Sequence, residues 1–455
     1  MNETPPRIYL ETYGCQMNEA DTEMITGLLT KAGWSVVSDP ALADVVILNT
    51  CAVRERAEER VAGRVRQLGL MKRYRPDLRI GLAGCMARHL GEDLLRRLPE
   101  LDILVGPDSY RRLAEILSRR DEGPLVDLAL ARDERYLGLP AARRGEVHAW
   151  VPIMRGCDRF CSFCVVPLVR GREKSLPHEE ILTQIEDLVH GGAIAVTLLG
   201  QTVNSYLDGE VDFAALLDRI ARIEGLVRVR YTSPHPADFT PEVFDAMARH
   251  ANLCRHVHLP VQSGADRILA AMRRGHTRAD YLALVGTIRA ALPDVALTTD
   301  LMVGFPGETP AEFEETLSLM REVRFDSAFL FRYSPRPGTY AHRKLPDDVP
   351  DREKGRRLSE MIALQEEISA ERYGRWVGRE VDVMVEGPSR RNPGCVRGKA
   401  DDFKTVVMPS LGDDRPGTVR RVRIARATTH TLIAEGIGDR HAAPELDLLA
   451  EIEGD

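Results

Sequence analysis

Apolar runs alternate with amphipathic segments along the first 120 residues of the chain. Three of the runs end in a cysteine, at Cys15, Cys51 and Cys85, and each predicts a buried strand. The runs cover residues 7–15, 43–51 and 78–85, a shorter one covers 101–106, and the helical segments cover 19–32, 54–74 and 88–98. This order is typical of a parallel α/β sheet, whose strands have their carboxyl ends at one edge. The pattern therefore predicts that the three cysteines lie together.

A longer alternation follows, after a segment without periodicity that contains several glycines, prolines and arginines. Its six predicted strands cover residues 149–155, 195–200, 227–233, 256–261, 295–304 and 327–333. Its predicted helices cover residues 178–190, 213–223, 241–250, 266–272, 278–292 and 311–323. Six strand–helix units make most of a β/α barrel, in which function is expected at the carboxyl ends of the strands.

The last part of the chain changes character. Residues 350–375 are charged and helix-like, and short β runs follow at 381–386, 405–408, 419–424 and 431–433. Short strands separated by turn residues predict a small antiparallel β-barrel, and the acidic end of the chain predicts disorder. The fold class is therefore α/β. Its predicted parts are an amino-terminal parallel sheet domain (1–120), a linker (121–147), a partial (β/α)6 barrel with a connecting helix (148–373), a small β-barrel (374–440) and a tail (441–455).

Composition narrows the class of protein. A chain of 455 residues exceeds the usual size of one hydrophobic core, and its 44% hydrophobic and 29% charged residues are typical of a soluble globular protein. No apolar run reaches the roughly 18 residues of a membrane span, and the first ten residues lack the apolar core of a signal peptide. We therefore expect a cytoplasmic protein with no membrane partner, in which the eight cysteines are reduced or metal-bound.

The net charge of -7 argues against a protein that coats nucleic acid with its whole surface. Residues 375–426 are an exception, because they hold 12 Lys or Arg against 7 Asp or Glu, a local charge of +5. A basic surface of this kind predicts binding to a polyanion. A merely solvated basic face is the alternative, since charge alone is not selective.

Three further cysteines, Cys157, Cys161 and Cys164, stand in one short loop after the first barrel strand. Iron-sulfur clusters normally take four thiolates, so a cluster held by these three would keep one iron open for a small ligand. The alternative is structural zinc, which needs four N or S ligands, and the next one along the chain, His178, lies beyond two prolines. The three-then-two spacing resembles the signature of the radical S-adenosylmethionine (radical SAM) superfamily, in which SAM chelates the open iron and is cleaved to a radical.

The three strand-end cysteines of the first domain predict a second cluster, again with one open iron. Each of them alone could be a small buried hydrophobe, which is a common role of free cysteine. His89 is the histidine nearest to this set and could be a fourth ligand, but it falls within the predicted helix start, where a surface position is more common. No role beyond packing is assigned to Cys254 and Cys395.

Under the radical SAM resemblance, the other strand ends of the barrel become candidates for binding SAM. Glycines there let the backbone approach a ligand, and Gln, Asn and Ser side chains can bond amino-acid and ribose groups. The candidates are Gly200, Gln201, Asn204, Ser233, Gln262, Ser263, Asp300 and Gly304. Residues 304–308 could equally be an ordinary turn, and His256 and His258 could simply pack in their strand.

Four motifs make the chain similar to the radical SAM methylthiotransferases along nearly its whole length. They lie at residues 12–18, 49–56, 156–172 and 258–266. At the first cysteine the chain reads Gly-Cys-Gln-Met-Asn, whereas the branch that modifies a ribosomal protein usually reads Gly-Cys-Pro-Lys-Asn and the threonylcarbamoyladenosine branch Gly-Cys-Lys-Val-Asn. The chain therefore resembles the branch that acts on dimethylallyladenosine in tRNA.

The resemblance implies a function and a set of partners. The chain would methylthiolate carbon 2 of N(6)-dimethylallyladenosine at position 37, in the tRNA anticodon loop, using two SAM molecules and two 4Fe-4S clusters, with no side chain assigned as acid or base. Its carboxyl-terminal barrel would be an RNA-binding TRAM domain. Other implied partners are an electron donor such as flavodoxin or ferredoxin and iron-sulfur assembly or carrier proteins, and a monomer is expected. The implied RNA contacts are Arg390, Arg391, Arg397, Lys399 and Lys404.

The chain departs from the family pattern at two places. It has Lys399 and Ala400 where the TRAM loop often has Arg and Thr, and it has Thr202 where Asn is more usual. Neither departure is expected to touch a cluster ligand. Methylthiolation of threonylcarbamoyladenosine in tRNA, or of a ribosomal protein, stays open as an alternative. So does an iron-sulfur electron carrier or sensor with an RNA-binding tail.

Overall fold

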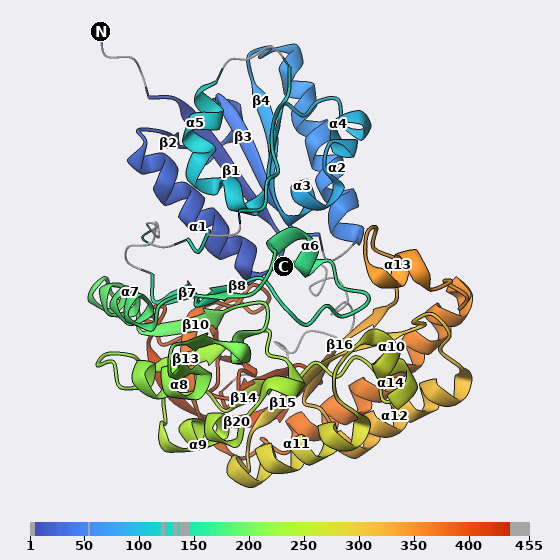
Figure 1. Cartoon of the computed structure of the whole chain (residues 1–455). Helices are drawn as coiled ribbons and strands as arrows, with labels where there is room; N and C mark the ends of the chain where they lie inside the picture. The colour runs from blue at the N-terminus through green and yellow to red at the C-terminus, as the bar shows by residue number, and fades with distance from the viewer. Residues whose placement is uncertain are drawn as a thin grey trace.

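The computed structural model describes residues 5–52, 55–119, 123–131, 134–136, 138 and 146–436. The chain forms an amino-terminal sheet domain, a central β/α domain and a carboxyl-terminal barrel (Figure 1). This confirms the predicted α/β fold class. The predicted tail lies outside the described residues, as does part of the predicted linker. None of the described helices has both the length and the apolar character that a bilayer span requires.

A six-stranded parallel sheet forms the core of the amino-terminal domain. Its strands, in spatial order, are β2 (Ser35–Val36), β1 (Arg7–Tyr13), β3 (Val45–Thr50), β4 (Arg79–Gly84), β5 (Ile103–Val105) and β6 (Leu125–Asp127). The strand order reverses between β1 and β3, and ligands of doubly wound sheets bind in the crevice at such a point. The sequence does not predict the edge strands β2 and β6, because two or three residues are too few to show a period.

Helices cover both faces of this sheet, which explains why its central strands are apolar on both sides. One face carries α1 (Gln16–Lys31) and α5 (Leu113–Ser118), and the other carries α2 (Glu55–Gly69), α3 (Cys85–Leu90) and α4 (Asp93–Arg97). The predicted helix 88–98 is two short helices, and the first of them begins at Cys85 itself. Cys85 therefore lies at a strand-to-helix junction.

The central domain is a partial barrel made of two three-stranded parallel sheets. The first sheet has the order β13 (Arg228–Tyr231), β10 (Ala195–Leu199) and β7 (His148–Pro152), and the second has the order β14 (His256–His258), β15 (Ala296–Val303) and β16 (Ser327–Arg332). A parallel bridge between Val229 and Leu253 joins the two sheets near the start of β14. All six strands overlap predicted strands, so the predicted partial barrel is confirmed.

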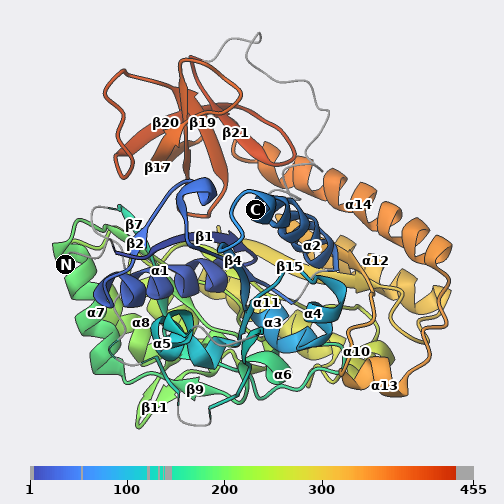
Figure 2. The same cartoon turned by 90° about the horizontal axis from the view of Figure 1, so that it is seen from above.

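Helices form an outer layer around these strands. They are α7 (His178–His190), α8 (Phe213–Ala221), α9 (Pro241–Arg249), α10 (Asp266–Met272), α11 (Arg278–Ala291) and α12 (Pro310–Val323). Their apolar faces pack on the strands in one large core that includes Ile181, Leu217, Val285 and Leu317. Two further helices have other partners: α6 (Val166–Arg170) lies between the central and amino-terminal domains, and α14 (Asp351–Gly374) leads to the carboxyl-terminal barrel (Figures 1 and 2).

Five strands close into the carboxyl-terminal barrel. Their order is β17 (Glu380–Pro388), β18 (Cys395–Lys399), β19 (Thr405–Pro409), β21 (Thr431–Ala434) and β20 (Val419–Ala427). Closure confirms the predicted small barrel. Neighbouring strands are antiparallel except β19 and β21, which run parallel. The sequence does not predict β18, because its Cys-Val-Arg-Gly-Lys run contains few apolar residues.

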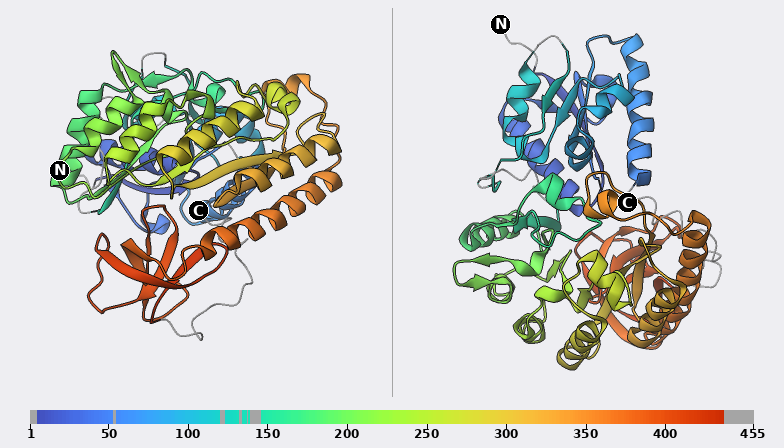
Figure 3. Two further views of the ribbon diagram at one scale, coloured as in Figure 1. Left: turned by 90° about the horizontal axis from the view of Figure 1, so that it is seen from below. Right: turned by 45° about the vertical axis from the view of Figure 1, so that its right-hand side comes forward.

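The small barrel, drawn in red in Figure 3, docks on the amino ends of the central strands. Arg228, the first residue of β13, donates to the Asp382 carbonyl at 2.8 Å. Lys404 Nζ lies 2.9 Å from the carboxylate of Asp326, which directly precedes β16. The small barrel therefore occupies the end of the central domain opposite to the loops that follow its strands.

The buried pair of Lys404 and Asp326 is expected to stabilise this docking. Arg372 also bonds to Asp326, at 2.8 Å, and Asp402 bonds to Lys404 at 2.5 Å. Replacing Lys404 by Met leaves two buried carboxylates with fewer partners, so we expect a loss of about 3 kcal/mol in the free energy of unfolding. Denaturant unfolding followed by the fluorescence of Trp376, whose ring lies 5.3 Å from Lys404 Nζ, measures this loss.

Arg397→Met is a matched control in the same small barrel. The Arg397 side chain is 42% exposed and approaches Glu386 only at 4.0 Å. Its replacement is expected to change the stability by less than about 0.5 kcal/mol. Equal losses in the two variants would contradict a special role of the buried pair.

Candidate functional site

Three neighbouring strands end at or next to a cysteine of the amino-terminal set. Cys51 and Cys85 directly follow β3 and β4, and Cys15 follows β1 after one intervening residue. The pairing of β1 with β3 runs to Thr50, and the pairing of β3 with β4 runs to Thr50 and Gly84, so the three strands end at one level. The structure thus brings the three cysteines to one sheet edge, as the pattern predicts. Two of them flank the point where the strand order reverses. Their role as metal ligands stays a prediction.

The thiols of this amino-terminal set interact with one another. A hydrogen bond with Cys51 lowers the pKa of the exposed Cys15 thiol, and the charge of Arg170 adds to this effect. Burial raises the pKa of the Cys85 thiol, although the charge of Arg170 opposes it. A thiol binds a metal only as thiolate. Burial disfavours the negative thiolate of Cys85. A bound cation would therefore stabilise the thiolates by supplying a compensating positive charge.

Two buried asparagines explain part of the motifs around the first two cysteines. Asn18 Nδ2 donates to Asn49 Oδ1 at 3.2 Å, and Asn49 Nδ2 donates to the Asn18 carbonyl at 2.9 Å. Cys15 Sγ lies 3.4 Å from Asn18 Oδ1. These contacts tie the first turn of α1 to the end of β3 and so hold Cys15 beside Cys51. The sequence analysis uses both asparagines only as part of a family signature and does not predict the link.

Helix α6 connects the amino-terminal set with the barrel cysteines. It begins two residues after Cys164 and ends at Arg170, whose side chain reaches the amino-terminal domain. There Arg170 Nε donates to Cys85 Sγ at 3.1 Å, and the terminal nitrogens donate to the Asp21 carboxylate at 3.2 and 2.5 Å. The apolar part of this contact consists of Ala52, Cys85, Val165 and Val169. Arg170 is not among the predicted site residues, because no sequence signal tells which surfaces of two domains meet.

The barrel cysteines lie in the loop after β8 (Met154–Arg155), at the carboxyl end of the first barrel strand. Burial raises the pKa of the Cys157 thiol, and it raises the pKa of Cys164 to about 12, with a further contribution from Cys161 in both thiols. Thiols whose charges disfavour one another in this way favour a bound cation that takes the place of their protons.

Two side chains contact the sulfur atoms of this barrel set. Arg274 Nη1 donates to Cys161 Sγ at 3.3 Å, and Thr202 Oγ1 lies 3.1 Å from Cys157 Sγ. Thr202 is one of the departures from the family pattern, and the expectation that it touches no candidate ligand is wrong. The contact arises because the end of β10 lies beside the end of β7 in the parallel sheet.

Neighbouring helices fix the backbone of this loop. Ser162 donates from its N–H to the Met272 carbonyl at 2.9 Å, and the Ala341 N–H donates to the Ser162 carbonyl at 2.7 Å. Gly156, directly before the first cysteine, has a φ of +75°, and a Cβ there would lie 2.0 Å from the Arg172 carbonyl oxygen. The loop can therefore take this path only with glycine at that position.

Buried donors beside the barrel set fit a bound cluster. Arg274 Nε and His235 Nε2 are buried and have no hydrogen-bond partner among the described residues. His235 Nδ1 accepts from the Ala237 N–H at 3.2 Å, and burial lowers the pKa of His235 to about 2, so its neutral ring carries the proton on Nε2. Hydrogen bonds to cluster sulfur are a usual feature of such sites. The donor set is therefore suited to an iron-sulfur cluster.

A site for one metal ion differs from a site for an iron-sulfur cluster. Over the described part of the chain, no three side chains of His, Cys, Asp or Glu are arranged to hold one ion. The thiolates of a 4Fe-4S cluster need not converge on one ion, because each thiolate binds a separate iron.

The SAM candidates after β10 are in contact with the cysteine loop. Gln201 Oε1 accepts a hydrogen bond from the Gly156 N–H. Gly200 lies against Met154, whose Cγ would be 2.6 Å from a Cβ at this position. Both residues thus support the loop, and a direct contact of either with SAM stays a prediction.

Two further candidates link the ends of β10 and β13. The Asn204 side chain donates to the His235 carbonyl at 2.9 Å and accepts from the His235 N–H at 2.7 Å. Both the amide nitrogen and the amide oxygen of Asn204 therefore bond to the backbone of His235. Ser233 is exposed, with a φ of +58°, and its carbonyl accepts from the Val203 N–H at 3.2 Å.

Gln262, four residues after the end of β14, lies beside Asp300 in the middle of β15. The Gln262 N–H donates to the Asp300 carbonyl at 2.9 Å. The Asp300 carboxylate lies 3.4 Å from His258 Nε2, and His258 Nδ1 lies 3.0 Å from the Thr298 hydroxyl. His258 therefore interacts with its neighbouring strand, as the packing alternative expects.

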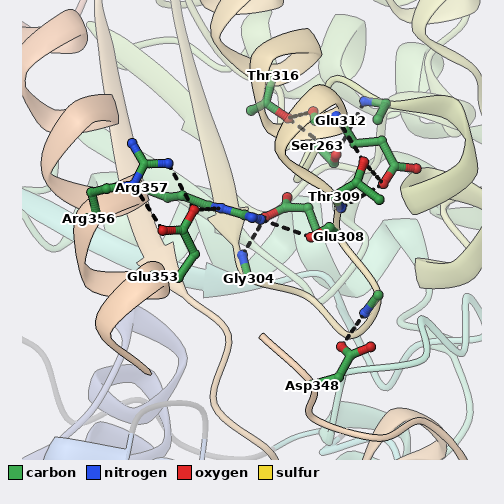
Figure 4. Close-up of polar contacts among 12 residues, drawn as sticks. Ser263, Gly304, Glu308, Thr309, Glu312, Thr316, Asp348, Glu353, Arg356 and Arg357 are labelled. Atoms are coloured by element: carbon green, nitrogen blue, oxygen red, sulfur yellow. Dashed lines mark hydrogen bonds and ion pairs between the residues drawn. The ribbon is translucent and has the colours of Figure 1, made fainter. Parts of the chain in front are cut away.

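Ser263 and Gly304 face other parts of the protein (Figure 4). The buried Ser263 hydroxyl lies 3.4 Å from Thr316 Oγ1 of α12. A Cβ on Gly304 would lie 2.4 Å from Lys354 Cγ of α14, so the close approach that glycine permits here is to a helix.

The turn after Gly304 is itself tied to α14. The Gly304 N–H donates to Glu308 Oε2 at 2.7 Å, and the same carboxylate pairs with Arg357 at 2.7 Å (Figure 4). Residues 304–308 therefore form a turn anchored to a helix, and a contact of Gly304 with SAM stays a prediction.

The predicted RNA contacts differ in their exposure. Arg390 and Arg391 are exposed between β17 and β18. Arg397 and Lys399 lie on β18 and are partly buried, and Lys399 Nζ donates to the Thr405 hydroxyl at 2.8 Å. Lys404 is buried against two carboxylates. The prediction that Lys404 contacts RNA is therefore corrected, since its charge is compensated inside the protein.

Other cysteines and His89 take no part in either set. His89 Nε2 lies 2.8 Å from the Pro337 carbonyl, in the contact between α3 and the central domain. Cys254 and Cys395 are buried in the central domain and the small barrel.

Comparisons with known proteins follow the same division of the chain. The radical SAM superfamily matches residues 151–320, and a family described as uncharacterized protein family UPF0004 matches residues 7–106. Similar proteins named tRNA-2-methylthio-N(6)-dimethylallyladenosine synthase include those of Chlorobium luteolum (46% identity over 94% of this chain and 96% of that one), Chloroherpeton thalassium (44%, 95% and 96%) and Chlorobaculum tepidum (43%, 96% and 99%). The chain belongs to the tRNA-2-methylthio-N(6)-dimethylallyladenosine synthase family.

Membership in this radical SAM enzyme family implies SAM and a 4Fe-4S cluster. Solved structures share the fold at low sequence identity. A cobalamin-dependent radical SAM enzyme, OxsB, has a TM-score of 0.55 at 14% identity, covering 79% of this chain and 56% of that one. The radical SAM methyltransferase TsrM from Kitasatospora setae has a TM-score of 0.53 at 15% identity, covering 74% of both chains. These likenesses concern the fold alone.

Gly156→Ala is expected to prevent cluster binding at the barrel set, because its methyl group would clash with the Arg172 carbonyl. The iron content of anaerobically reconstituted protein should fall, and if the untouched amino-terminal set also binds a cluster, about half of the iron should remain.

Gly171→Ala is the matched control. Gly171 also has a φ of +75°, but no atom lies within 4 Å of a Cβ there, so only backbone strain of about 1 kcal/mol is added. The Gly171→Ala variant should keep its iron. Equal iron loss in both variants would attribute the effect to strain and contradict the steric argument.

Proposed function

We propose that this chain methylthiolates carbon 2 of N(6)-dimethylallyladenosine at position 37 of tRNA, using two SAM molecules and two 4Fe-4S clusters. One observation carries the proposal: two sets of three cysteines, from different domains, lie at the two ends of the contact made by α6. This helix has five residues, a rise of about 7 Å. An enzyme that only cleaves SAM has no need of the second set.

The substrate explains why two sets are required. Carbon 2 of adenine is unactivated, so no side-chain base can remove its hydrogen, and a cofactor must carry that step. In the proposal, SAM at the barrel set would supply the radical for this hydrogen. A cluster at the amino-terminal set would hold the sulfur that another SAM methylates and that is delivered as methylthio. The chain's own residues hold the thiolates, donate hydrogen bonds to sulfur through Arg274 and Arg170, and keep the two sets at a fixed separation.

The tRNA must present its base at the interface of the amino-terminal and central domains. Enzymes that act on a base take it out of the stack, and unpaired anticodon-loop bases can be splayed out at low cost. We also infer that a small redox protein such as flavodoxin or ferredoxin supplies electrons, that iron-sulfur carrier proteins load the cysteines, and that the chain acts as a monomer in the cytoplasm.

The test of this function is the nucleoside composition of tRNA. In cells that lack the protein, mass spectrometry should find dimethylallyladenosine without its methylthio group, and the intact gene should restore the group. Replacing Cys15, Cys51 and Cys85 by Ala should abolish restoration, while the purified triple variant still forms 5′-deoxyadenosine from SAM, because the barrel set is intact.

Cys395→Ala is the control, since this cysteine lies outside both sets, and it should restore the modification. Loss of the methylthio group from threonylcarbamoyladenosine or from a ribosomal protein, with dimethylallyladenosine unaffected, would favour one of the alternatives. Restoration by the triple variant would contradict a role of the amino-terminal set.

Binding of tRNA by the small barrel is tested by its dependence on salt. Replacing the exposed Arg390 and Arg391 by Gln should weaken tRNA binding and reduce the slope of log K against log salt by about 1.4 to 1.8, if each contacts one phosphate. Arg356→Gln is the control, because Arg356 lies on α14, outside the small barrel. An unchanged slope in the double variant would exclude these two arginines as phosphate contacts.

A further inference from the structure

Arg170 is a buried charge at the centre of the contact between the two cysteine sets. Its side chain is 3% exposed, and that of Asp21, its partner, is 2% exposed. Removing both charges from water costs several kcal/mol per ion, which a close pair offsets only when its geometry is good. A purely structural contact between domains is made more cheaply by apolar side chains.

The geometry assigns separate tasks to the nitrogens of this guanidinium. The two terminal nitrogens donate to the two oxygens of Asp21, and this fork fixes the plane of the group. The remaining nitrogen, Nε, then points at Cys85 Sγ, 3.1 Å away. Asp21 is held in turn by the buried Tyr110 hydroxyl at 3.4 Å. The hydrogen bond to sulfur is therefore preorganised.

A second buried arginine serves as an internal comparison. Arg155 also joins the central to the amino-terminal domain, where it pairs with Asp108, and its side chain is 1% exposed. Its guanidinium lies 4.2 Å from the centre of the Tyr136 ring, and it donates hydrogen bonds to oxygen atoms of Asp108 and of the Glu134 carbonyl. The two arginines thus share the docking role, and only Arg170 adds a contact to a candidate ligand.

We propose that Arg170 is a positioning residue that holds the Cys85 sulfur in place and raises the reduction potential of the cluster bound by Cys15, Cys51 and Cys85. An electron that enters this cluster adds negative charge to its thiolates. A charge-assisted hydrogen bond to one of them becomes stronger when that charge grows, so it stabilises the reduced state. The inference rests on the proposed second cluster.

The experiment isolates the amino-terminal cluster. In a background with Cys157, Cys161 and Cys164 replaced by Ala, the full chain is reconstituted with iron and sulfide under anaerobic conditions. Its midpoint potential is then measured by titration with dithionite, followed by visible absorption and electron paramagnetic resonance. Arg170→Met is expected to lower the equilibrium constant for one-electron reduction at least tenfold, which is about 59 mV.

Arg170→Lys and Arg155→Met complete the test. Lysine keeps the charge but cannot hold both Asp21 and the sulfur with one rigid group, so the potential should lie between those of the parent and the Met variant. If Arg170→Met binds no iron while Arg155→Met does, the loss supports the positioning role, and the Lys variant then decides the effect on potential.

Two results would overturn the inference. One is an unchanged potential in both Arg170 variants, and the other is an equal shift in Arg155→Met, which would reflect domain docking in general. Absence of any cluster in the parent background is a separate outcome, because it would remove the second cluster from the proposed function and this inference with it.

Discussion

The buried pair of Arg170 and Asp21 is the interaction on which the geometry between the two cysteine sets depends. Each set belongs to a domain with its own hydrophobic core, and separate cores alone leave the domains free to move against each other. Arg170 removes this freedom because it is five residues from the end of the barrel cysteine loop and directly contacts Cys85. Breaking a buried pair of this kind typically costs 3–5 kcal/mol. The contact is therefore strong enough to keep the sets at one separation.

Sequence reasoning could predict the parts of this site that depend on local pattern. The amino-terminal cysteines end up together because strands in a parallel sheet finish at one edge, and this rule needs only the order of the elements. Arg170 could not be found in this way, since its two partners are 85 and 149 residues away. Gly304 shows a contact that its local sequence could not predict. Its sequence context resembles a ligand-binding strand end, but the space beside it is filled by Lys354 from a helix that comes 50 residues later.

The small barrel demonstrates a second limit of sequence reasoning. A local charge of +5 predicts a polyanion site, but composition does not distinguish free charges from compensated ones. Lys404 pairs with Asp326 of another domain, and Arg420 pairs with Asp414 at 2.8 Å. Part of the local positive charge is therefore compensated by carboxylates that contribute to docking and folding. The positive field that RNA would meet comes from exposed basic residues, such as Arg390.

The position of the small barrel separates RNA binding from chemistry in the proposed function. It docks at the amino ends of the central strands, whereas the cysteine loop follows their carboxyl ends. The longest of these strands, β15, has eight residues and therefore spans about 26 Å. A tRNA held through its phosphates by the small barrel must extend over at least this length before its base reaches the cysteines. Because phosphate contacts position a nucleic acid without reading its sequence, selection of the modified base has to occur at the cysteine face, where residues of the amino-terminal and central domains meet.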